Sequence, residues 1–377
     1  MKIVYCIVGT FNSGGMERVL TNKANYLAKM GYDISIITTD QKERKPYFDL
    51  DKRVSQYDLE LNYTDEINVS LFRKILVFKR KQKNHRGKLS ALLLRLKADI
   101  VISMFDHDAT FLHTLKDGSK KVLEIHFSRY KRLQYGRKGI WKLVNMFRSW
   151  TDLNTAKKYH SFVVLTHEDK GYWGDLPNIT VIPNANSFIP QKHADLIAKK
   201  VIAVGRYDYQ KGFDELIQAW KHVYRVHPDW SLSIFGHGPL AETLQSLIQD
   251  LELQDVVRLC TPVKNIEKEY VSSSILAMTS RYEGLPMALL EGQVCGLPLV
   301  SYACKCGPKD IIHEGENGFL LAERDQEGLA GKLVLLMHNA TLRKQMGRTS
   351  RALSLNYTEE IIMKQWFDLF KQLIKNN

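Results

Sequence analysis

Short apolar runs and amphipathic segments alternate along this chain from its first residues. Lys2–Val8 predicts a buried strand, Glu17–Met30 a helix that stops at Gly31, and Asp33–Thr39 a second strand. Further apolar runs predict strands over residues 100–104, 122–125, 162–165, 180–182, 201–204, 231–235, 256–259, 275–279 and 299–301. Strands that alternate with helices form parallel sheets, so the predicted fold class is α/β.

The length of the chain and a proline-containing segment near its middle indicate two domains. Its 377 residues, of which 44% are hydrophobic, exceed what one core usually organises. Residues 183–200 contain Pro183 and Pro190 and separate one alternation of strands and helices from the next. We therefore predict an N-terminal domain over residues 1–187 and a C-terminal domain over residues 188–357. The tail, 358–377, predicts an amphipathic helix whose apolar residues share one stripe: Ile361, Ile362, Trp366, Leu369, Phe370 and Leu373.

Two carboxylates flank a predicted strand-to-helix turn in the second domain. The apolar run before them is broken by Gly284, and a helix rich in alanine and leucine begins near Met287. Glu283 lies in the turn and Glu291 in the second turn of the helix, so both can reach the crevice where open α/β sheets bind ligands. A carboxylate there can accept hydrogen bonds from two hydroxyl groups at once. Taken alone, the pair has another interpretation, in which Glu283 caps the helix and Glu291 is solvated.

A basic loop follows the first predicted strand of the second domain. Arg206 and Lys211 stand five residues apart, directly after Val201–Val204. An Arg presents a bidentate fork to phosphate oxygens, and a Lys presents a mobile point charge. The pair is therefore suited to a departing phosphate, although an Arg and a Lys in a surface loop often have no such role.

Glycine pairs follow two of the predicted strands. Gly14 and Gly15 open the first helix, and Gly236 and Gly238 follow the strand over residues 231–235. Glycines at such turns let backbone N–H groups approach an anion at a helix N-terminus, but they are as often simple tight turns. The first pair lacks the G-x-G-x-x-G spacing of a dinucleotide site, which disfavours a dehydrogenase.

The carboxylate pair and its surroundings resemble a known group of enzymes. Glu283 and Glu291 match the E-x7-E motif of retaining glycosyltransferases of family 4, and Cys295–Val300 and Gly307–Asp310 are similar to that family. The resemblance is strong over residues 201–321 and weaker in the N-terminal half. It implies the GT-B architecture of two facing Rossmann-like domains with a deep cleft between them. The N-terminal domain would bind the acceptor, the C-terminal domain would bind the donor, and the C-terminal helix would cross back to the first domain.

The resemblance also implies roles for individual residues. Arg206 and Lys211 would bind the donor diphosphate. Glu283 would bind hydroxyls of the donor sugar, and Glu291 the nucleotide ribose. Other residues would line the donor site with their backbone or allow the donor to come close: Gly14, Gly15, Gly236, Gly238, Gly284, Leu285 and Met287.

One histidine completes the implied site. His126 ends a predicted strand and resembles the family histidine that approaches the anomeric region of the donor sugar, although a lone His at a strand end is more often structural. His107, within the Asp-His-Asp segment 106–108, competes for the role. We interpret that segment as a loop, because no D-x-D motif flanked by apolar residues marks a divalent site. Since Arg206 and Lys211 supply positive charge, we expect no metal and no cofactor besides the nucleotide-sugar.

The function implied is transfer of a hexose from a nucleotide-sugar, by family frequency a UDP-sugar, with retention of configuration. The acceptor would be a glycan or a lipid-linked glycan in cell-surface polysaccharide synthesis. Two other functions remain possible at this stage. A UDP-sugar epimerase of the same fold would form product from the donor alone, and a nucleotide-sugar-binding protein without catalysis would bind the donor and never turn it over.

Positive charge is concentrated in the N-terminal half. Through Pro190 there are 32 Lys and Arg against 19 Asp and Glu, whereas the rest of the chain has 22 of each. Arg73–Lys97 contains ten basic residues and no acid, and Arg129–Arg148 mixes basic with aromatic residues. Such helices suit an anionic membrane surface, at about 1 kcal/mol per basic residue near the bilayer. A solvated face is the alternative; nucleic acid is a weaker one, and we expect no nucleic acid partner.

The sequence also bears on location. It has no run of eighteen or more apolar residues and no signal-peptide pattern at its start, which predicts a cytoplasmic protein. The basic N-terminal half would place that protein peripherally at the inner face of the membrane. Its five cysteines are odd in number and include no C-x2-C pair, so we expect reduced thiols.

Overall fold

The computed structural model describes residues 1–65, 70–132 and 139–375, and it contains two parallel sheets. The N-terminal sheet has seven strands in the order β3-β2-β1-β4-β5-β6-β7. Its strands are β1 (Lys2–Ile7), β2 (Asp33–Thr38), β3 (Ser55–Asp58), β4 (Ile100–Ser103), β5 (Lys120–Glu124), β6 (Ser161–Val164) and β7 (Ile179–Val181). The order reverses between β1 and β4, and ligands of open α/β sheets bind at such a switch point.

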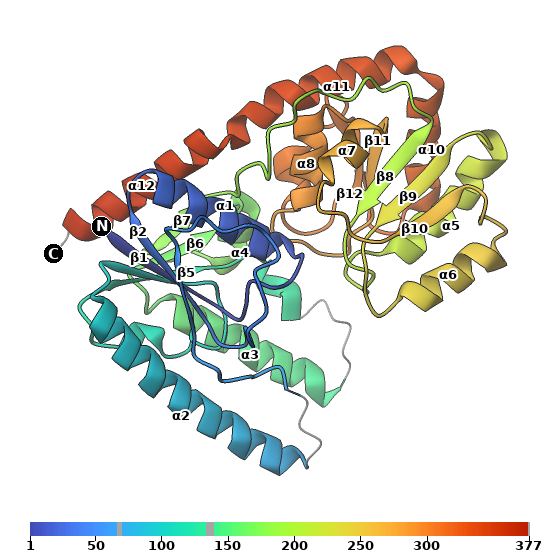
Figure 1. Cartoon of the computed structure of the whole chain (residues 1–377). Coiled ribbons are helices and arrows are strands. Elements are labelled where there is room, and N and C mark those ends of the chain that lie inside the picture. Colours follow the sequence, from blue (N-terminus) through green and yellow to red (C-terminus); the bar gives the residue numbers. More distant parts are fainter. Residues whose placement is uncertain (66–69, 133–138, 376–377) are drawn as a thin grey trace.

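Helices cover both faces of this sheet (Figure 1). They are α1 (Gly15–Lys29), α2 (Leu71–Leu96), α3 (Ile140–Ala156) and α4 (His167–Trp173), with the 3₁₀ turns η1 (Leu112–Thr114) and η2 (Arg129–Arg132). Because side chains alternate along a strand, Tyr5 of β1 packs with α1, whereas Val4 and Cys6 face α2. The central strands β1, β2, β4, β5 and β6 are buried on both sides, as the continuous apolar runs predict.

The C-terminal sheet has six strands in the order β10-β9-β8-β11-β12-β13. They are β8 (Lys200–Val204), β9 (Ser231–Phe235), β10 (Val257–Cys260), β11 (Ile275–Met278), β12 (Leu299–Tyr302) and β13 (Gly318–Leu321). The helices are α5 (Phe213–Val226), α6 (Ala241–Asp250), α7 (Glu267–Val271), α8 (Met287–Cys295), α9 (Pro308–Ile311), α10 (Gln326–His338) and α11 (Ala340–Ser354). Helices α5, α6 and α10 cover one face, and α7, α8 and α9 cover the other.

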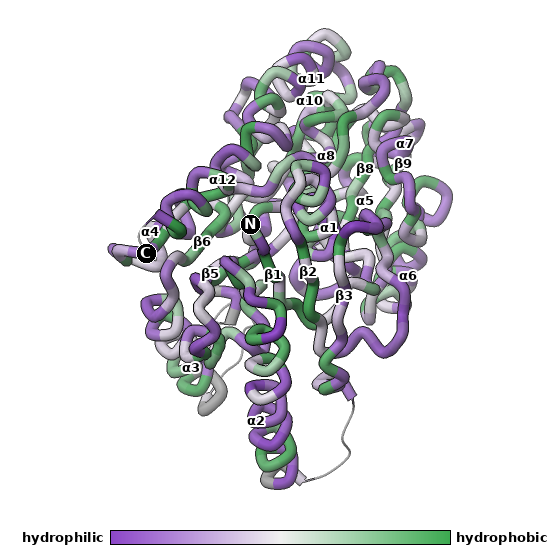
Figure 2. Tube along the Cα trace, turned by 60° about the vertical axis from the view of Figure 1, so that its left-hand side comes forward, coloured by the Kyte–Doolittle hydropathy of each residue, from purple (hydrophilic) through white to green (hydrophobic). Residues whose placement is uncertain are grey.

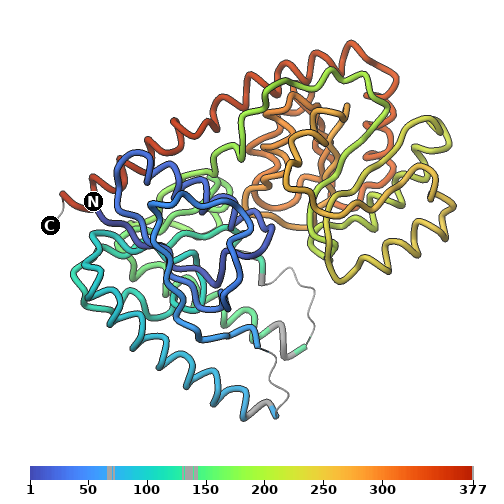
Figure 3. Tube along the Cα trace, viewed as in Figure 1, coloured from blue at the N-terminus to red at the C-terminus, as the bar shows by residue number. Residues whose placement is uncertain are grey.

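The last helix returns to the first domain. After the 3₁₀ turn η3 (Leu355–Tyr357), α12 (Glu359–Lys375) runs from the C-terminal domain along the N-terminal sheet (Figures 1 and 3). Its apolar stripe, including Trp366 and Phe370, is buried in the same core as α1 and β1. Ile361, predicted to share the stripe, is instead 45% exposed, and Met363 is buried. The expected crossing of the C-terminal helix is therefore confirmed, and every strand predicted from sequence is present within one or two residues of its expected ends.

Candidate active site

A lysine and a glutamate meet at the centre of the cleft side of the C-terminal sheet. Lys211 follows β8 and Glu283 follows β11, and because β8 and β11 are neighbours, the two loops lie side by side. Lys211 Nζ lies 2.6 Å from Glu283 Oε1, and Gln210 Nε2 donates to Tyr282 O at 2.9 Å. The side chains of Lys211 and Glu283 are 19% and 7% exposed. Glu283 is therefore not a helix cap, and two residues that were predicted separately for the site are brought together.

Arg206 lies at the same end of the sheet but is mostly solvated. Its side chain is 64% exposed, and its guanidinium lies 2.9 Å from Asp208 Oδ2. It also faces the other domain, since its charge acts on Glu17 near the start of α1. Burial raises the pKa of Glu17, while its bonds to the backbone and to Asn12 and the charges of Arg206 and His126 oppose that rise. Arg206 thus stands at the mouth of the cleft, where an anion can reach it.

The turn after β11 touches the N-terminal domain through its backbone. Ser128 N–H donates to Glu283 O at 3.2 Å. A Cβ added to Gly284 would lie 2.5 Å from His126 O and 3.0 Å from Phe127 Cα, so only glycine allows this approach. The structure therefore places His126 beside the Glu283 turn. His107 is instead stacked on Tyr63 with ring centroids 3.9 Å apart.

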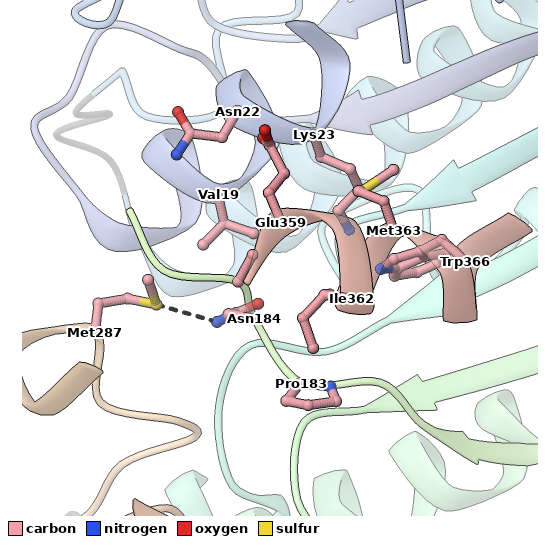
Figure 4. A pocket seen from close by; sticks show the side chains of 11 residues that line it. Val19, Asn22, Lys23, Pro183, Asn184, Met287, Glu359, Ile362, Met363 and Trp366 are labelled. Atoms are coloured by element: carbon pink, nitrogen blue, oxygen red, sulfur yellow. Dashed lines mark hydrogen bonds between the residues drawn. The ribbon is translucent and has the colours of Figure 1, made fainter. Parts of the chain in front are cut away.

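His126 belongs to a buried charged network. Glu124 Oε1 lies 2.6 Å from Lys23 Nζ and 3.0 Å from His126 Nε2, and the three side chains are 1%, 6% and 7% exposed. His126 and Glu124 are close enough to form an ion pair, but their atoms are not aligned for a hydrogen bond. Lys23 Nζ also lies 3.9 Å from the centre of the Trp366 ring, which comes from α12 (Figure 4).

Burial and pairing oppose each other in this network. Burial alone would raise the pKa of Glu124, but the charges of Lys23 and His126 outweigh it and hold that pKa at about 2. Burial lowers the pKa of Lys23, while Glu124 raises it. At 2.6 Å, and with an aromatic face on the ammonium, the ionised Lys23–Glu124 pair is the form that the geometry supports. Sequence reasoning missed both residues.

Glu291 has a buried partner that sequence reasoning also missed. Tyr270 of α7 donates its hydroxyl to Glu291 Oε2 at 2.9 Å, and Glu291 is 6% exposed. The interpretation of Glu291 as a solvated residue is therefore wrong. Burial raises the pKa of Tyr270, Glu291 raises it further, and the charge of Arg18 on α1 opposes that shift. The Tyr270–Glu291 pair therefore lies near enough to the first helix of the other domain for the charge of Arg18 to act on it.

The N-termini of two helices converge at the same place. A Cβ on Gly15, at the start of α1, would lie 3.3 Å from Met287 Cγ, at the start of α8. A Cβ on Gly14 would lie 2.2 Å from Glu17 Oε2, so that glycine lets Glu17 fold back over the turn. Asn184 Nδ2 donates a hydrogen bond to Met287 Sδ at 3.4 Å, beside a cavity of about 20 Å³ (Figure 4). Helix N-termini carry partial positive charge, so this region suits an anion.

The second glycine pair supports the basic loop. A Cβ on Gly236 would lie 1.9 Å from Gly205 O, and one on Gly238 would lie 2.5 Å from Tyr207 O. Tyr207 N–H donates to His237 O at 2.8 Å. These glycines therefore allow the loops after β8 and β9 to pack backbone against backbone. Their contact with a nucleotide stays a prediction.

A further contact joins the domains outside the predicted site. Cys306 N–H donates to Glu168 Oε2 at 2.9 Å, and Cys306 Sγ lies 3.5 Å from Asp169 Oδ1, at the start of α4. All five cysteines are free thiols. Over the described ranges no three metal-ligating side chains cluster, and none of the helices there is long and apolar enough to cross a membrane.

Comparisons with known proteins cover the whole chain. A family profile described as "Glycosyltransferase Family 4" matches residues 13–185, and one described as "Glycosyl transferases group 1" matches residues 186–353. An uncharacterized glycosyltransferase of Haemophilus influenzae is 31% identical over 97% of this chain and 98% of its own length. The amylovoran biosynthesis glycosyltransferase AmsD of Erwinia amylovora is 31% identical over 98% of this chain and 99% of its own.

More distant similarities extend to an enzyme with a named acceptor and to solved structures. A Campylobacter jejuni α-1,4-N-acetyl-D-galactosaminyltransferase that acts on a GalNAc-containing diNAcBac-PP-undecaprenol is 25% identical over 100% of this chain and 99% of its own. TarM of Staphylococcus aureus, solved with UDP, matches with a TM-score of 0.79 at 17% identity, over 98% of this chain and 99% of that one. A sucrose-phosphate synthase from Thermosynechococcus elongatus matches with a TM-score of 0.85 at 15% identity, over 100% of both chains. These structures support the fold, two Rossmann-like domains facing across a cleft.

Proposed function

This chain belongs to glycosyltransferase family 4, and we propose that it transfers a hexose from a UDP-sugar to a glycan or lipid-linked acceptor with retention of configuration. It is a glycosyltransferase of cell-surface polysaccharide synthesis, as its relatives are. The observation that carries the proposal is the 2.6 Å pair between Lys211 and Glu283, in a cleft where two helix N-termini converge.

The diphosphate would bind between the N-termini of α1 and α8. The backbone around Gly14, Gly15 and Met287 supplies helix-terminal dipoles there, and Lys211 and Arg206 supply full charges. Positive charge and N–H dipoles stabilise the charge that develops on a departing phosphate. Because Arg206 is exposed and faces Glu17, it can swing onto a bound phosphate without breaking a buried contact. This charge makes a divalent metal unnecessary in the proposal.

The sugar would lie between Glu283 and His126. Glu283 accepts hydrogen bonds from donor hydroxyls, and Lys211 then shares its ammonium between Glu283 and the phosphate. The bond between the anomeric carbon and the phosphate oxygen breaks with its electron pair going to the phosphate. The acceptor oxygen forms its bond on the same face, and its proton passes to the leaving phosphate. No protein base is required for this proton balance.

Sugar transfer with purified protein tests the proposal. A panel of UDP- and GDP-sugars is screened for hydrolysis and for thermal stabilisation, with and without EDTA. Arg206→Ala and Lys211→Ala should lower turnover by about 10²–10³-fold, the range for loss of one charge-stabilising group, while EDTA should have no effect. Lys199→Ala is the control, because Lys199 pairs with Asp229 on the surface. Full activity in both site variants would refute the phosphate assignment, and conversion of the UDP-sugar to its epimer without an acceptor would indicate an epimerase.

We further propose that the protein works in the cytoplasm at an anionic membrane surface, through α3 and α2. Leu143, Met146, Phe147 and Trp150 follow helical spacing on one face of α3, and they are 65%, 51%, 63% and 57% exposed. Ten basic residues lie in Arg73–Lys97, most of them exposed along α2, where hydrophilic and hydrophobic positions mix (Figure 2). Exposed apolar side chains beside basic ones suit the headgroup region of an anionic bilayer.

Vesicle co-sedimentation tests the membrane proposal. The protein should bind vesicles that contain anionic lipid and not neutral ones, and Phe147→Glu should weaken that binding at least tenfold. Leu355→Glu is the matched control, because Leu355 is 62% exposed in the connection before α12. Equal binding to neutral vesicles, or equal losses in both variants, would contradict the proposal.

A further inference from the structure

A second hollow lies next to the Glu283 turn, at the carboxyl ends of β11, β12 and β13. Its volume is about 230 Å³. Its floor includes the buried side chains of Glu215, Ser280 and Tyr302, and its rim includes the exposed residues Glu323 and Arg324. The hollow shares no lining residue with the donor site proposed above. It is smaller than the roughly 300–1,000 Å³ pockets that hold drug-sized ligands, so it suits a ligand of about one ring.

The floor contains polar groups that the described part of the chain leaves without partners. Ser280 is 0% exposed, and neither its hydroxyl nor Arg281 Nε has a hydrogen-bond partner in residues 1–65, 70–132 and 139–375. A buried polar group left unpaired costs about 1–3 kcal/mol, so such groups are usually completed by a ligand or by water. Both residues line the hollow, so these unpaired hydrogen-bonding groups lie at its floor.

The charges of the floor and the rim together balance, which argues against an anion. Arg281 donates to Asp214 Oδ2 at 2.7 Å and to Glu215 Oε1 at 2.9 Å, so its charge is already neutralised. Burial raises the pKa of Tyr302, and the Glu215 carboxylate raises it further, so the phenol remains a neutral donor. The rim carries one acid, Glu323, and two bases, Lys305 and Arg324. Hydroxyl, carboxylate and guanidinium groups together suit a neutral polyol, because each sugar hydroxyl both donates and accepts.

The hollow lies next to Glu283, the carboxylate proposed to bind the donor sugar. Ser280–Tyr282 line it, and Glu283 follows directly. Gln210 Nε2 contacts both sides, at 2.9 Å from Tyr282 O and 3.4 Å from Glu283 Oε2. A sugar in the hollow would therefore lie beside a donor held by Glu283. We propose that this hollow is a second carbohydrate subsite, which holds one sugar residue of the acceptor glycan on the donor-binding domain. The assignment to the acceptor rests on the transferase function proposed above.

Ligand-observed NMR on the full chain tests the subsite without requiring turnover. The probes are the methyl α-glycosides of glucose, galactose and N-acetylgalactosamine, with saturating UDP to occupy the donor site, and inorganic sulfate as the anionic probe. At least one glycoside should bind in the presence of UDP. Ser280→Ala and Tyr302→Phe should each weaken it by about 2–10-fold, the value of one hydrogen bond. Ser301→Ala is the matched control, because Ser301 is also buried but donates to Tyr302 O at 2.9 Å and does not line the hollow.

The outcomes separate this inference from the proposed function. Binding of UDP without binding of any glycoside would overturn the subsite and leave the transferase proposal standing. A glycoside that is displaced by UDP, or that binds Ser280→Ala as well as the unmodified protein, would also overturn it. Sulfate that displaces the glycoside would show an anion site instead. Ser280→Ala should keep or raise the melting temperature, since it removes an unpaired buried hydroxyl, whereas a purely structural role predicts a lower one.

Discussion

Replacing Glu124 with leucine should lower the free energy of unfolding by about 3–5 kcal/mol, because it strands a buried lysine. Lys23 Nζ lies 2.6 Å from the Glu124 carboxylate, and the two side chains are 6% and 1% exposed. Most of the loss comes from the uncompensated ammonium and not from the pair itself, since apolar replacements of both partners are often neutral. Adding Lys23→Met to Glu124→Leu should therefore restore most of the lost stability.

Urea unfolding followed by far-UV circular dichroism measures these differences. The control is Asp229→Ala, which breaks the surface pair with Lys199, where the side chains are 48% and 60% exposed. Exposed pairs contribute about 0–1 kcal/mol, so that variant should hardly change the midpoint. The reasoning is refuted if Glu124→Leu is as mild as Asp229→Ala, or if the double variant with Lys23→Met is no more stable than Glu124→Leu.

The same network predicts an acid limb in the stability curve. The folded pKa of Glu124 is about 2, below the ordinary value of 4.5, so the unfolded chain binds more protons between those values. The contribution is fully present above about pH 4.5 and is lost as the pH falls toward 2. At about 1.4 kcal/mol per pH unit it amounts to roughly 3 kcal/mol, which matches the mutational estimate. Glu124→Leu should flatten the curve in that window.

Three further outcomes are expected. Gly284→Ala should reduce transfer at least tenfold and raise the Kd for UDP as well, because its Cβ would lie 2.5 Å from His126 O and push apart the two domains whose helix N-termini would hold the diphosphate; parallel rate and UDP-binding measurements check this. Tyr270→Phe should raise the Kd for UDP about 2–10-fold by freeing Glu291, with titration calorimetry as the assay. Burial raises the pKa of Asp108 from 3.8 to about 7, so stability should fall as pH rises through that range, and Asp108→Asn should reduce the slope in urea titrations at pH 5 and 8.

The parts of the fold that sequence predicted are those that burial determines. Central strands such as β1 and β8 are buried along most of their length and therefore read as apolar runs. The two strands that were missed, β3 and β13, lie at the edges of their sheets. Strand β3 has the sequence SQYD and no buried residue, and β13 is four residues that begin with a glycine. An edge strand gains its structure from one neighbour, which its own sequence does not report.

The same distinction applies to the site. Lys211 and Glu283 could be predicted because each follows a predicted strand directly, and the carboxyl ends of parallel strands meet at one edge. The pairing of Lys23 with Glu124 joins positions 101 residues apart, on a helix and within a strand. Neither position differs in sequence from an ordinary exposed charge. The packing of α12, which brings Trp366 onto Lys23, contributes to burying this location.

The way the chain crosses between domains limits how the cleft can open. It crosses twice, at the segment between β7 and β8 and at η3 before α12. The crossings are bonded to each other, since Asn186 N–H donates to Tyr357 O at 2.8 Å and Asn186 Nδ2 donates to Ser354 O at 2.9 Å. Contacts on the cleft side are fewer: Ser128 N–H bonds to Glu283 O beside the Gly284 approach, and Cys306 contacts the carboxylates of Glu168 and Asp169. The weak contacts can separate while the paired crossings hold, so opening must rotate about the crossings and move Lys211 and Glu283 together, as one unit, away from His126.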